Sequence, residues 1–284
     1  DAPLLAGISK RTMEQLGDFI PQELSSTAWA FAKLSWHDEP LIRSIAQAAV
    51  GEMEASQQPG PRMLVANDGN NNTNNNNSNN NTNHESSSDN NTTSGDRGRS
   101  YISSSLYSSN RGNNNNHSHS NSVNGNGHPN SRRPLGAYAF DIVACSGLAW
   151  SFATLQFLHE PTMRTLAATA ARVMRSCKTQ ELSNLVWAYA TLSIKDPPLL
   201  EAAGEVILAR TPEFQSQHLT NTAWALARLQ HSDAAVMQTL ARETMKRLND
   251  MDVQGLSNVV WAWAKQLLKD DDLLKSLASA ASRR

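Results

Sequence analysis

A tryptophan-centred segment recurs along the chain and constrains the fold more than any other feature. The five copies are LSSTAWAFAKL from Leu24, CSGLAWSFATL from Cys145, LSNLVWAYATL from Leu182, LTNTAWALARL from Leu219 and LSNVVWAWAKQ from Leu256. The tryptophans of the last four copies, Trp150, Trp187, Trp224 and Trp261, follow one another every 37 residues. A fixed period of this length is typical of a repeat array, in which each unit packs on its neighbours.

Each copy predicts an amphipathic helix. With the tryptophan of the copy as position zero, apolar residues recur at helical spacing, as in Leu182, Leu185, Tyr189 and Leu192. This pattern predicts a helix from about −8 to +6. Position −8 is Thr179 or Ser216 in two copies, and we expect these residues to be N-caps.

A second helix is predicted in the remainder of each unit. Position +9 is aspartate in four copies (Asp38, Asp196, Asp233 and Asp270), and proline stands close behind it. Aspartate accepts hydrogen bonds from the free amides of a helix N-terminus, and the fixed φ of proline suits the first turn. Apolar residues then recur through Leu199, Leu200, Ala203, Ile207 and Leu208. The predicted fold is therefore all-α, an α-solenoid of stacked 37-residue αα-hairpins.

Small residues and the tryptophan indicate how the hairpins stack. Positions +1 and +3 are Ala or Ser in every copy, for example Ala188 and Ala190. We expect +3 to contact the neighbouring unit, because a bulky side chain there would hold the helices apart. The tryptophan ring lies at the edge of the apolar arc, so it is predicted to pack between units.

The array is interrupted by a long insertion. Trp29 and Trp150 are 121 residues apart, which is one period of 37 plus 84 residues. Residues 56–139 consist largely of Asn, Ser, Thr, Gly and His and are expected to be disordered. Residues 1–55 are predicted to hold half a unit and one full unit, and residues 140–284 four further units. The chain is thus expected to be a slice of a longer array.

Composition and motifs exclude several classes of function. The insertion carries six Arg and four acidic residues, so the rest holds 19 of the 25 basic and 22 of the 26 acidic residues. This balance argues against strong non-specific binding to nucleic acid. Neither Cys145 nor Cys177 has a metal-ligand or CxxC partner, and both are expected to be buried thiols. His117 and His119 are attributed to the polar composition of the insertion. No catalytic motif, cofactor site or membrane-spanning run is present in the sequence, so we predict no enzyme, no cofactor and no metal.

A polar stripe recurs on the first helix. Positions −7, −3 and +4 fall at about 20°, 60° and 40° on a helical wheel, with −6 beside them, so they project from one ridge. Glutamine recurs at −7, Asn at −3 in the last three units, and +4 is Lys, Arg or Thr. The candidate residues are Gln22, Glu23, Ser26 and Lys33 of the first unit, Gln180, Glu181, Asn184 and Thr191 of the third, Gln217, His218, Asn221 and Arg228 of the fourth, and Gln254, Asn258 and Lys265 of the fifth.

The stripe admits more than one interpretation. Amides at −3 and −7 suit the hydrogen-bonding edges of bases, a cation at +4 suits phosphate, and the variable position −6 suits a reader of one base per unit. The stripe is equally consistent with a solvated helix face, or with Asn at −3 and Ser or Thr at −4 in hydrogen bonds between helices. A protein-binding solenoid of the armadillo or HEAT type would use the same concave face for a peptide or helix.

The repeat unit resembles a known family. Gln180 to Leu192, with its Trp-Ala-x-Ala core, resembles the octotricopeptide repeat of algal organelle proteins, including chloroplast translation factors. It is also similar to helical repeats beside RAP domains and in kinetoplastid RNA-editing complexes. The resemblance covers the chain outside the insertion, although the period of 37 differs from the nominal 38 and the second unit departs at Val143, Cys145 and Gly147.

The resemblance implies sequence-specific binding of single-stranded organellar RNA, in a chloroplast or mitochondrion, by an array that performs no catalysis. Translation, transcript stability, splicing and editing are the processes it implies, and protein partners are compatible with it. An enzymatic activity would require a further domain, such as a RAP-like domain after Arg284. Five units would read about five nucleotides if each reads one base.

Overall fold

The computed structural model describes residues 2–57, 139–266 and 271–282, which form α-helices joined by short turns. The first helices of the five units are α2 (Pro21–Lys33), α4 (Ile142–Thr154), α6 (Thr179–Thr191), α8 (Ser216–Arg228) and α10 (Val253–Lys265). The second helices are α3 (Glu39–Gln57), α5 (Glu160–Val173), α7 (Pro197–Arg210), α9 (Ala234–Lys246) and α11 (Asp271–Ser282), and α1 (Ala2–Gln15) precedes them. Single 3-10 turns connect the units: η1 (Leu16–Asp18), η3 (Met174–Ser176), η4 (Thr211–Glu213) and η5 (Leu248–Asp250).

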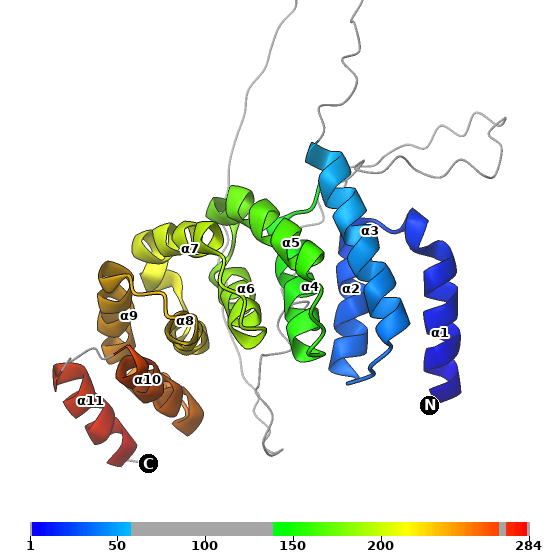
Figure 1. Ribbon diagram of the computed structural model, residues 1–284. Coiled ribbons are helices and arrows are strands. Elements are labelled where there is room, and N and C mark those ends of the chain that lie inside the picture. Colours follow the sequence, from blue (N-terminus) through cyan, green and yellow to red (C-terminus); the bar gives the residue numbers. More distant parts are fainter. Residues whose placement is uncertain (1, 58–138, 267–270, 283–284) are drawn as a thin grey trace, which may run out of the picture.

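The helices stack in two layers, which confirms the predicted all-α solenoid. Successive first helices contact one another from α2 through α4, α6 and α8 to α10, and successive second helices do so from α1 through to α11. Figure 1 shows the array curving, with the first helices along its inner side and the second helices along its outer side. One apolar core runs through both layers, because each helix is covered by its partner in the hairpin and by the helices of adjacent units.

Small residues lie at the contacts between first helices, as predicted. The side chains at +3, Ala32, Ala153, Ala190 and Ala227, are buried, whereas Ala264 of α10 is exposed. Position −1 behaves in the same way: Val186 is fully buried and Val260 of α10 is 43% exposed. Within the described residues no first helix packs beyond α10, so these two positions mark the side of each helix that the next unit covers.

The insertion leaves the stacking of the first two units intact. Helices α2 and α4 contact each other, as do α3 and α5, in the way that later units do. The helical register therefore resumes at α4, as the repeat spacing predicts. The proposed disorder of residues 56–139, together with His117 and His119, falls almost wholly on positions 58–138, which lie outside the described residues.

The first helices begin where predicted, but their caps lie one residue earlier. Thr179 and Ser216 are the first residues of α6 and α8 rather than their N-caps, so this prediction was wrong. The N-cap is position −9, where Asp141 and Asp252 each accept a hydrogen bond from the backbone amide three residues further on, at 2.8 and 2.7 Å. Aspartate at −9 satisfies an amide that has no partner within the helix.

The first helices end at +4 instead of the predicted +6, because the chain turns left-handed at +6. Ser35, Gln156, Ser193 and Gln230 occupy this position with φ between 51° and 59°. The amide at +7 then bonds to the carbonyl at +2, as Ile194 does to Tyr189 at 2.9 Å. This is the Schellman arrangement that commonly ends a helix, although a glycine usually occupies its left-handed position.

The second helices begin as the sequence predicts. Asp38, Asp196 and Asp233 accept hydrogen bonds from the amides of Leu41, Leu199 and Val236, respectively, at 3.0 to 3.1 Å. Asp270 lies outside the described residues. Helix α1 packs on α3 as second helices do elsewhere, which agrees with the assignment of the N-terminal segment to half a unit. Leu208, which was placed on the apolar face of α7, is instead exposed.

Cys145 and Cys177 are buried free thiols, as expected. Burial raises the pKa of both, that of Cys177 to about 11, so neither is a reactive thiolate at neutral pH. None of the helices in the described ranges is both long and apolar enough to cross a membrane.

Candidate functional site

A groove of about 590 Å³ lies on the first-helix layer where α6, α8 and α10 meet. Its walls come from the C-terminal half of α6, from α8 as far as Trp224, and from the end of η5 through the first turns of α10. The lining residues are Trp187, Thr191, Ser216, Gln217, Thr220, Asn221, Trp224, Asp250, Met251, Asp252, Gln254, Gly255 and Asn258. Three consecutive units therefore contribute to one concavity, which is how a helical solenoid builds an extended binding surface.

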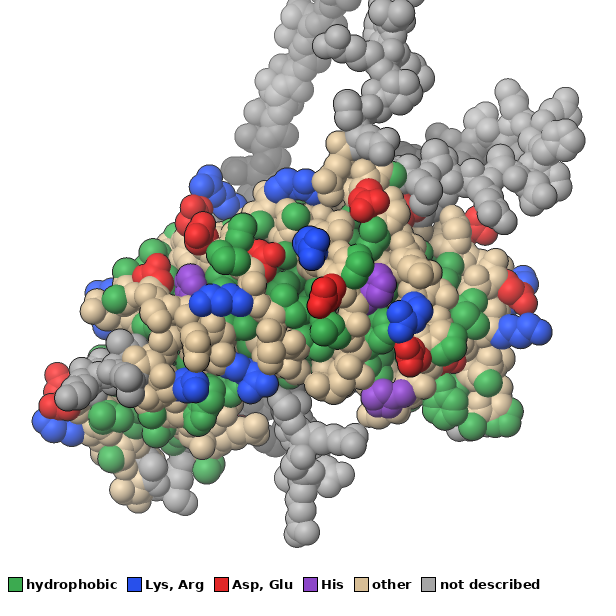
Figure 2. Space-filling model, viewed as in Figure 1, with side chains coloured by type: hydrophobic (Ala, Val, Ile, Leu, Met, Phe, Trp, Pro, Cys, Tyr) green, Lys and Arg blue, Asp and Glu red, His purple; other side chains and the backbone are tan. Residues whose placement is uncertain are grey.

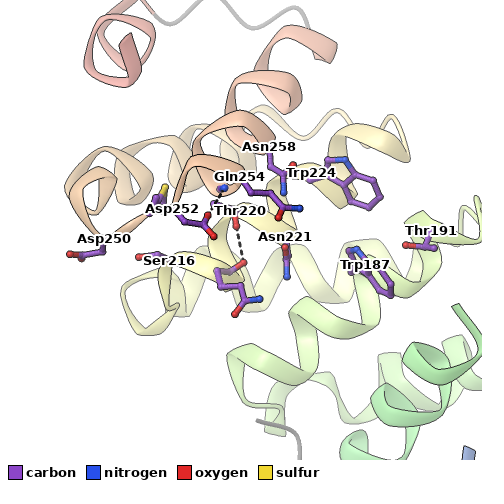
Figure 3. A pocket seen from close by; sticks show the side chains of 13 residues that line it. Trp187, Thr191, Ser216, Thr220, Asn221, Trp224, Asp250, Asp252, Gln254 and Asn258 are labelled. Carbon is purple, nitrogen blue, oxygen red and sulfur yellow. Dashed lines mark hydrogen bonds between the residues drawn. The ribbon is translucent and has the colours of Figure 1, made fainter. Parts of the chain in front are cut away.

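Five of the fifteen predicted stripe residues converge in this groove. They are Thr191, Gln217, Asn221, Gln254 and Asn258. Figure 3 shows the amide groups of Asn221, Gln254 and Asn258 beside one another, next to the two indole rings. A side-chain amide offers two donors and one acceptor carbonyl. Three such groups, one from α8 and two from α10, can satisfy the donor and acceptor pattern of a planar polar ligand.

Two tryptophan rings border the same groove. Trp187 and Trp224 are half-buried, and each both packs against the core and lines the groove. The predicted packing role is confirmed for them and for Trp150, which is 5% exposed, but it is incomplete. Trp187 and Trp224 are therefore residues that the sequence interpretation set aside, and the signal that could have found them is the presence of tryptophan in all five units.

Ten stripe residues do not line the groove. They are Gln22, Glu23, Ser26, Lys33, Gln180, Glu181, Asn184, His218, Arg228 and Lys265. Asn184 shows why the wheel was misleading, since its side chain is only 3% exposed within the stack of α4, α6 and α8. Ser26 instead donates to the carbonyl of Gln22 one turn earlier, at 2.7 Å.

Position −6 serves helix capping rather than the groove. The carboxylates of Glu23 and Glu181 accept hydrogen bonds from the backbone amides of Ile20 and Lys178 at 2.9 and 2.6 Å. Each contact is the returning half of a capping box, in which the third helical residue reaches back to the N-cap amide, because Ile20 and Lys178 have no side-chain acceptor for the other half. His218 contacts Thr179 of the preceding unit at 3.0 Å, and burial lowers the pKa of its imidazole, so it is neutral at pH 7.

The type of residue at −6 depends on the residue at the N-cap, position −9. Units with aspartate at −9 have Ala144 or Gly255 at −6, whereas the units with glutamate at −6 have Ile20 or Lys178 at −9. In each of these four helices, one acidic side chain thus accepts a hydrogen bond from a free backbone amide at the N-terminus. The hypothesis that −6 varies because it reads a base loses its main support.

Position +4 places a cation over a tryptophan in two units. The Nζ of Lys33 lies 5.6 Å from the ring centroids of both Trp29 and Trp150, across the seam between the first two units. Arg228 lies 5.5 Å from the Trp224 ring, and its Nε donates to the carbonyl of Ala190 at 2.8 Å. Both are cation–π contacts. Arg228 is therefore bound to the preceding unit rather than directed at a phosphate.

Charge is mixed on the surface of the array. In the view of Figure 2, Lys and Arg side chains alternate with Asp and Glu and do not gather into one patch. Asp250 and Asp252 line the groove, although Asp252 is engaged as the N-cap of α10. In the described part of the chain no three His, Cys, Asp or Glu side chains are grouped to hold a metal ion. Recognition in the groove would depend on amides and rings more than on charge.

Comparison with known proteins relates the C-terminal part of the chain to one family. Residues 203–284 match the family model described as RNA-editing substrate-binding complex 6 protein. No curated protein matches the chain. The matched segment includes most of α7 and all of α8 to α11, so it holds Asn221, Trp224, Gln254 and Asn258 of the groove but not Trp187 or Thr191. The name of this family refers to an RNA-editing complex, which agrees with one of the resemblances drawn from the repeat unit.

Proposed function

We propose that the chain binds single-stranded RNA in a sequence-specific manner along the groove formed by α6, α8 and α10. The observation that carries this proposal is the convergence of three amides, from Asn221, Gln254 and Asn258, with two indole rings in one groove. Proteins recognise single-stranded RNA by stacking its bases on aromatic side chains and by hydrogen bonds to their edges. The groove supplies both kinds of group.

The similarity of residues 203–284 supports an RNA ligand and a setting in a larger assembly, since the name of the matched family refers to a substrate-binding complex for RNA editing. We propose accordingly that the protein acts in organellar RNA metabolism, as an octotricopeptide-like repeat protein, with RNA and protein partners. The process it serves is translation, transcript stability, splicing or editing, in a mitochondrion or chloroplast. The repeats themselves are proposed to perform no catalysis.

The near-neutral charge of the array shapes this proposal. Because acidic residues slightly outnumber basic ones outside the insertion, non-specific attraction to the phosphate backbone should be weak and affinity for a random RNA low. A favoured sequence must then gain its affinity from contacts to the bases. We therefore expect a large ratio between the affinities for a selected RNA and for a random one.

The test compares a groove variant with a matched variant on the outer layer. An RNA selected from a randomised single-stranded pool is titrated against the wild-type chain, the Asn221→Ala/Asn258→Ala variant and the Gln47→Ala/Gln238→Ala variant, whose exposed amides lie on α3 and α9. Loss of two base contacts should weaken binding roughly tenfold or more. The outer-layer variant should bind as the wild type does. Equal affinity and equal sequence preference for all three, with unchanged circular dichroism, would refute the groove as the binding site.

Binding of a protein partner is the second candidate function. A second concavity, of about 650 Å³, lies on the second-helix layer between α7 and α9, where Leu208, Pro212 and Met245 form an apolar floor beside Arg242 and Lys246. This candidate would be favoured if a stable protein partner co-purified with the chain, if no RNA were crosslinked to it, and if Leu208→Asp released the partner.

A further inference from the structure

The residue at +4 differs between units in whether it places a cation over the preceding tryptophan ring. In the first unit Lys33 reaches across the seam and places its ammonium over Trp29 and Trp150 together. In the fourth unit Arg228 lies over Trp224. In the third unit the same position is Thr191, whose side chain is too short to cover the Trp187 ring.

At the seam between the third and fourth units the +4 residue therefore leaves the preceding tryptophan uncovered. Among the described residues no cation lies over the ring of Trp187, and both Trp187 and Thr191 line the groove. The Thr191 hydroxyl is buried and has no hydrogen-bond partner among the described residues. Asn221 of the next unit lies beside the ring, with its amide in the groove (Figure 3).

The other seams differ from this one. Between the first two units, the space next to the rings holds the Lys33 ammonium, and Gly147 stands where the later units have asparagine. At the seam between the second and third units +4 is also threonine, Thr154, but the Trp150 ring is only 5% exposed, so it is not available to a ligand. Between the last two units, Trp224 and Trp261 are already in contact, with ring centroids 6.2 Å apart at an interplanar angle of 34°.

We propose that one nucleobase stacks on Trp187 at the seam between the third and fourth units, with Asn221 bonded to its edge, and that a cation at +4 keeps a base from a tryptophan that is otherwise exposed. This proposal rests on the proposed RNA-binding function. Its consequence is that the array does not read one base at every unit. Lysine at +4 closes a seam with a cation from the protein itself, whereas threonine leaves a half-buried ring such as that of Trp187 uncovered.

The substitution Thr191→Lys tests the proposal, because two accounts of the site predict opposite results. It copies the arrangement of Lys33 and would place an ammonium over Trp187, so stacking should be blocked and affinity for the selected RNA should fall by roughly tenfold, the scale of one lost base–aromatic contact. If the groove attracted RNA only through charge, the added cation would strengthen binding instead. Tighter or unchanged binding by Thr191→Lys would overturn the proposal.

Three further variants distinguish loss of stacking from loss of the fold. Thr191→Val preserves the size of the side chain and should retain most of the affinity, because the ring stays open. Trp187→Leu should lose binding as Thr191→Lys does. Trp187→Phe should retain part of the affinity, since a phenyl ring still stacks. Thermal unfolding of each variant verifies its fold. Failure of the wild-type chain to bind any RNA from the pool would refute the proposed function itself. Binding by the wild type that survives Thr191→Lys and Trp187→Leu would refute only the stacking site.

Discussion

The side chain of Ser25 occupies the space into which a Cβ on Gly147 would project. Gly147 is at −3 of α4 and Ser25 at −4 of α2, and a Cβ added to Gly147 would collide with the Oγ of Ser25. The two helices thus approach closely at this point, and the glycine that interrupts the Asn pattern of the repeat is a packing requirement. The second unit departs from the repeat because of the unit before it.

This contact predicts that Gly147→Ala changes the free energy of unfolding in opposite directions in the wild type and in a Ser25→Ala variant. Gly147→Ala should lower the free energy of unfolding by about 1 kcal/mol, because the new methyl group overpacks the seam. In a Ser25→Ala background the obstacle is gone, and the same change should raise stability by about 0.5–1 kcal/mol through helix propensity. Urea denaturation of the four proteins measures both values. Additive effects in this double-mutant cycle would contradict the contact.

The left-handed residues that end the first helices predict a stabilising change. Gln230 has a φ of 52°, a conformation that costs a residue with a Cβ about 1 kcal/mol more than glycine. Gln230→Gly should therefore raise the free energy of unfolding by up to about 1 kcal/mol. Gln238→Gly, at an exposed position inside α9, should lower it by about the same amount. A loss of stability in Gln230→Gly would argue against the Schellman ending.

Two arginines at the ends of second helices form a clamp. Arg247 follows α9 and donates to the carbonyls of Phe214 and Pro212 at 2.5 Å while its Nε bonds to Glu243 at 2.9 Å. Arg210 makes the corresponding bond to the carbonyl of Cys177 at 2.7 Å. Both arginines thereby hold the end of a second helix against the start of the first helix of the same unit.

Removal of this arginine clamp should lower the stability of the fold. Arg247→Ala should lower the free energy of unfolding by about 1.5–3 kcal/mol, the scale of hydrogen bonds to a charged group. Arg175→Ala is a matched control, because Arg175 is exposed and its pair with Glu205 is a surface ion pair, worth at most about 1 kcal/mol. Equal effects of the two substitutions, measured by thermal unfolding, would show that the carbonyl contacts of Arg247 contribute little.

The capping glutamate of α6 predicts a dependence on pH. Burial raises the pKa of Glu181, although the amide of Lys178 acts in the opposite direction. Because the folded state disfavours the ionised form, stability is lost as pH rises above the ordinary value of 4.5 and through the raised pKa. Glutamine cannot ionise and still accepts the bond from Lys178. The stability of Glu181→Gln relative to wild type should therefore increase with pH and then level off; a gain that shrinks as pH rises would contradict this.

The repeat pattern was sufficient to predict the fold, because its determinants are local. The spacing of tryptophans, the aspartates at +9 and the small residues at +3 each act within one hairpin or between adjacent hairpins. The exact caps and the ends of the first helices were missed because their sequence signals are weaker. These signals are aspartate at −9, glutamate at −6 and a left-handed residue that is not glycine.

The site was less predictable, because it depends on how each unit is rotated on the next. A helical wheel placed Asn184, Asn221 and Asn258 on one ridge, but Asn184 is buried between its neighbours while the other two line the groove. Positions +4 and −6 were interpreted as phosphate and base contacts, yet Arg228 and Glu181 are engaged with backbone atoms of the protein. Such engagements follow from three-dimensional packing rather than from position in a repeat.

Crosslinking of a selected RNA to the wild-type chain, followed by mass spectrometry of the attached peptides, is the measurement that tests the central claim most directly. With the RNA bound at the groove, crosslinks should fall on α6, α8 and the start of α10, and the modified residues should include Trp187 or Trp224. The same crosslinks should be lost in the Asn221→Ala/Asn258→Ala variant. Crosslinks confined to the outer helices α5, α7 and α9, or none at saturating RNA, would contradict it.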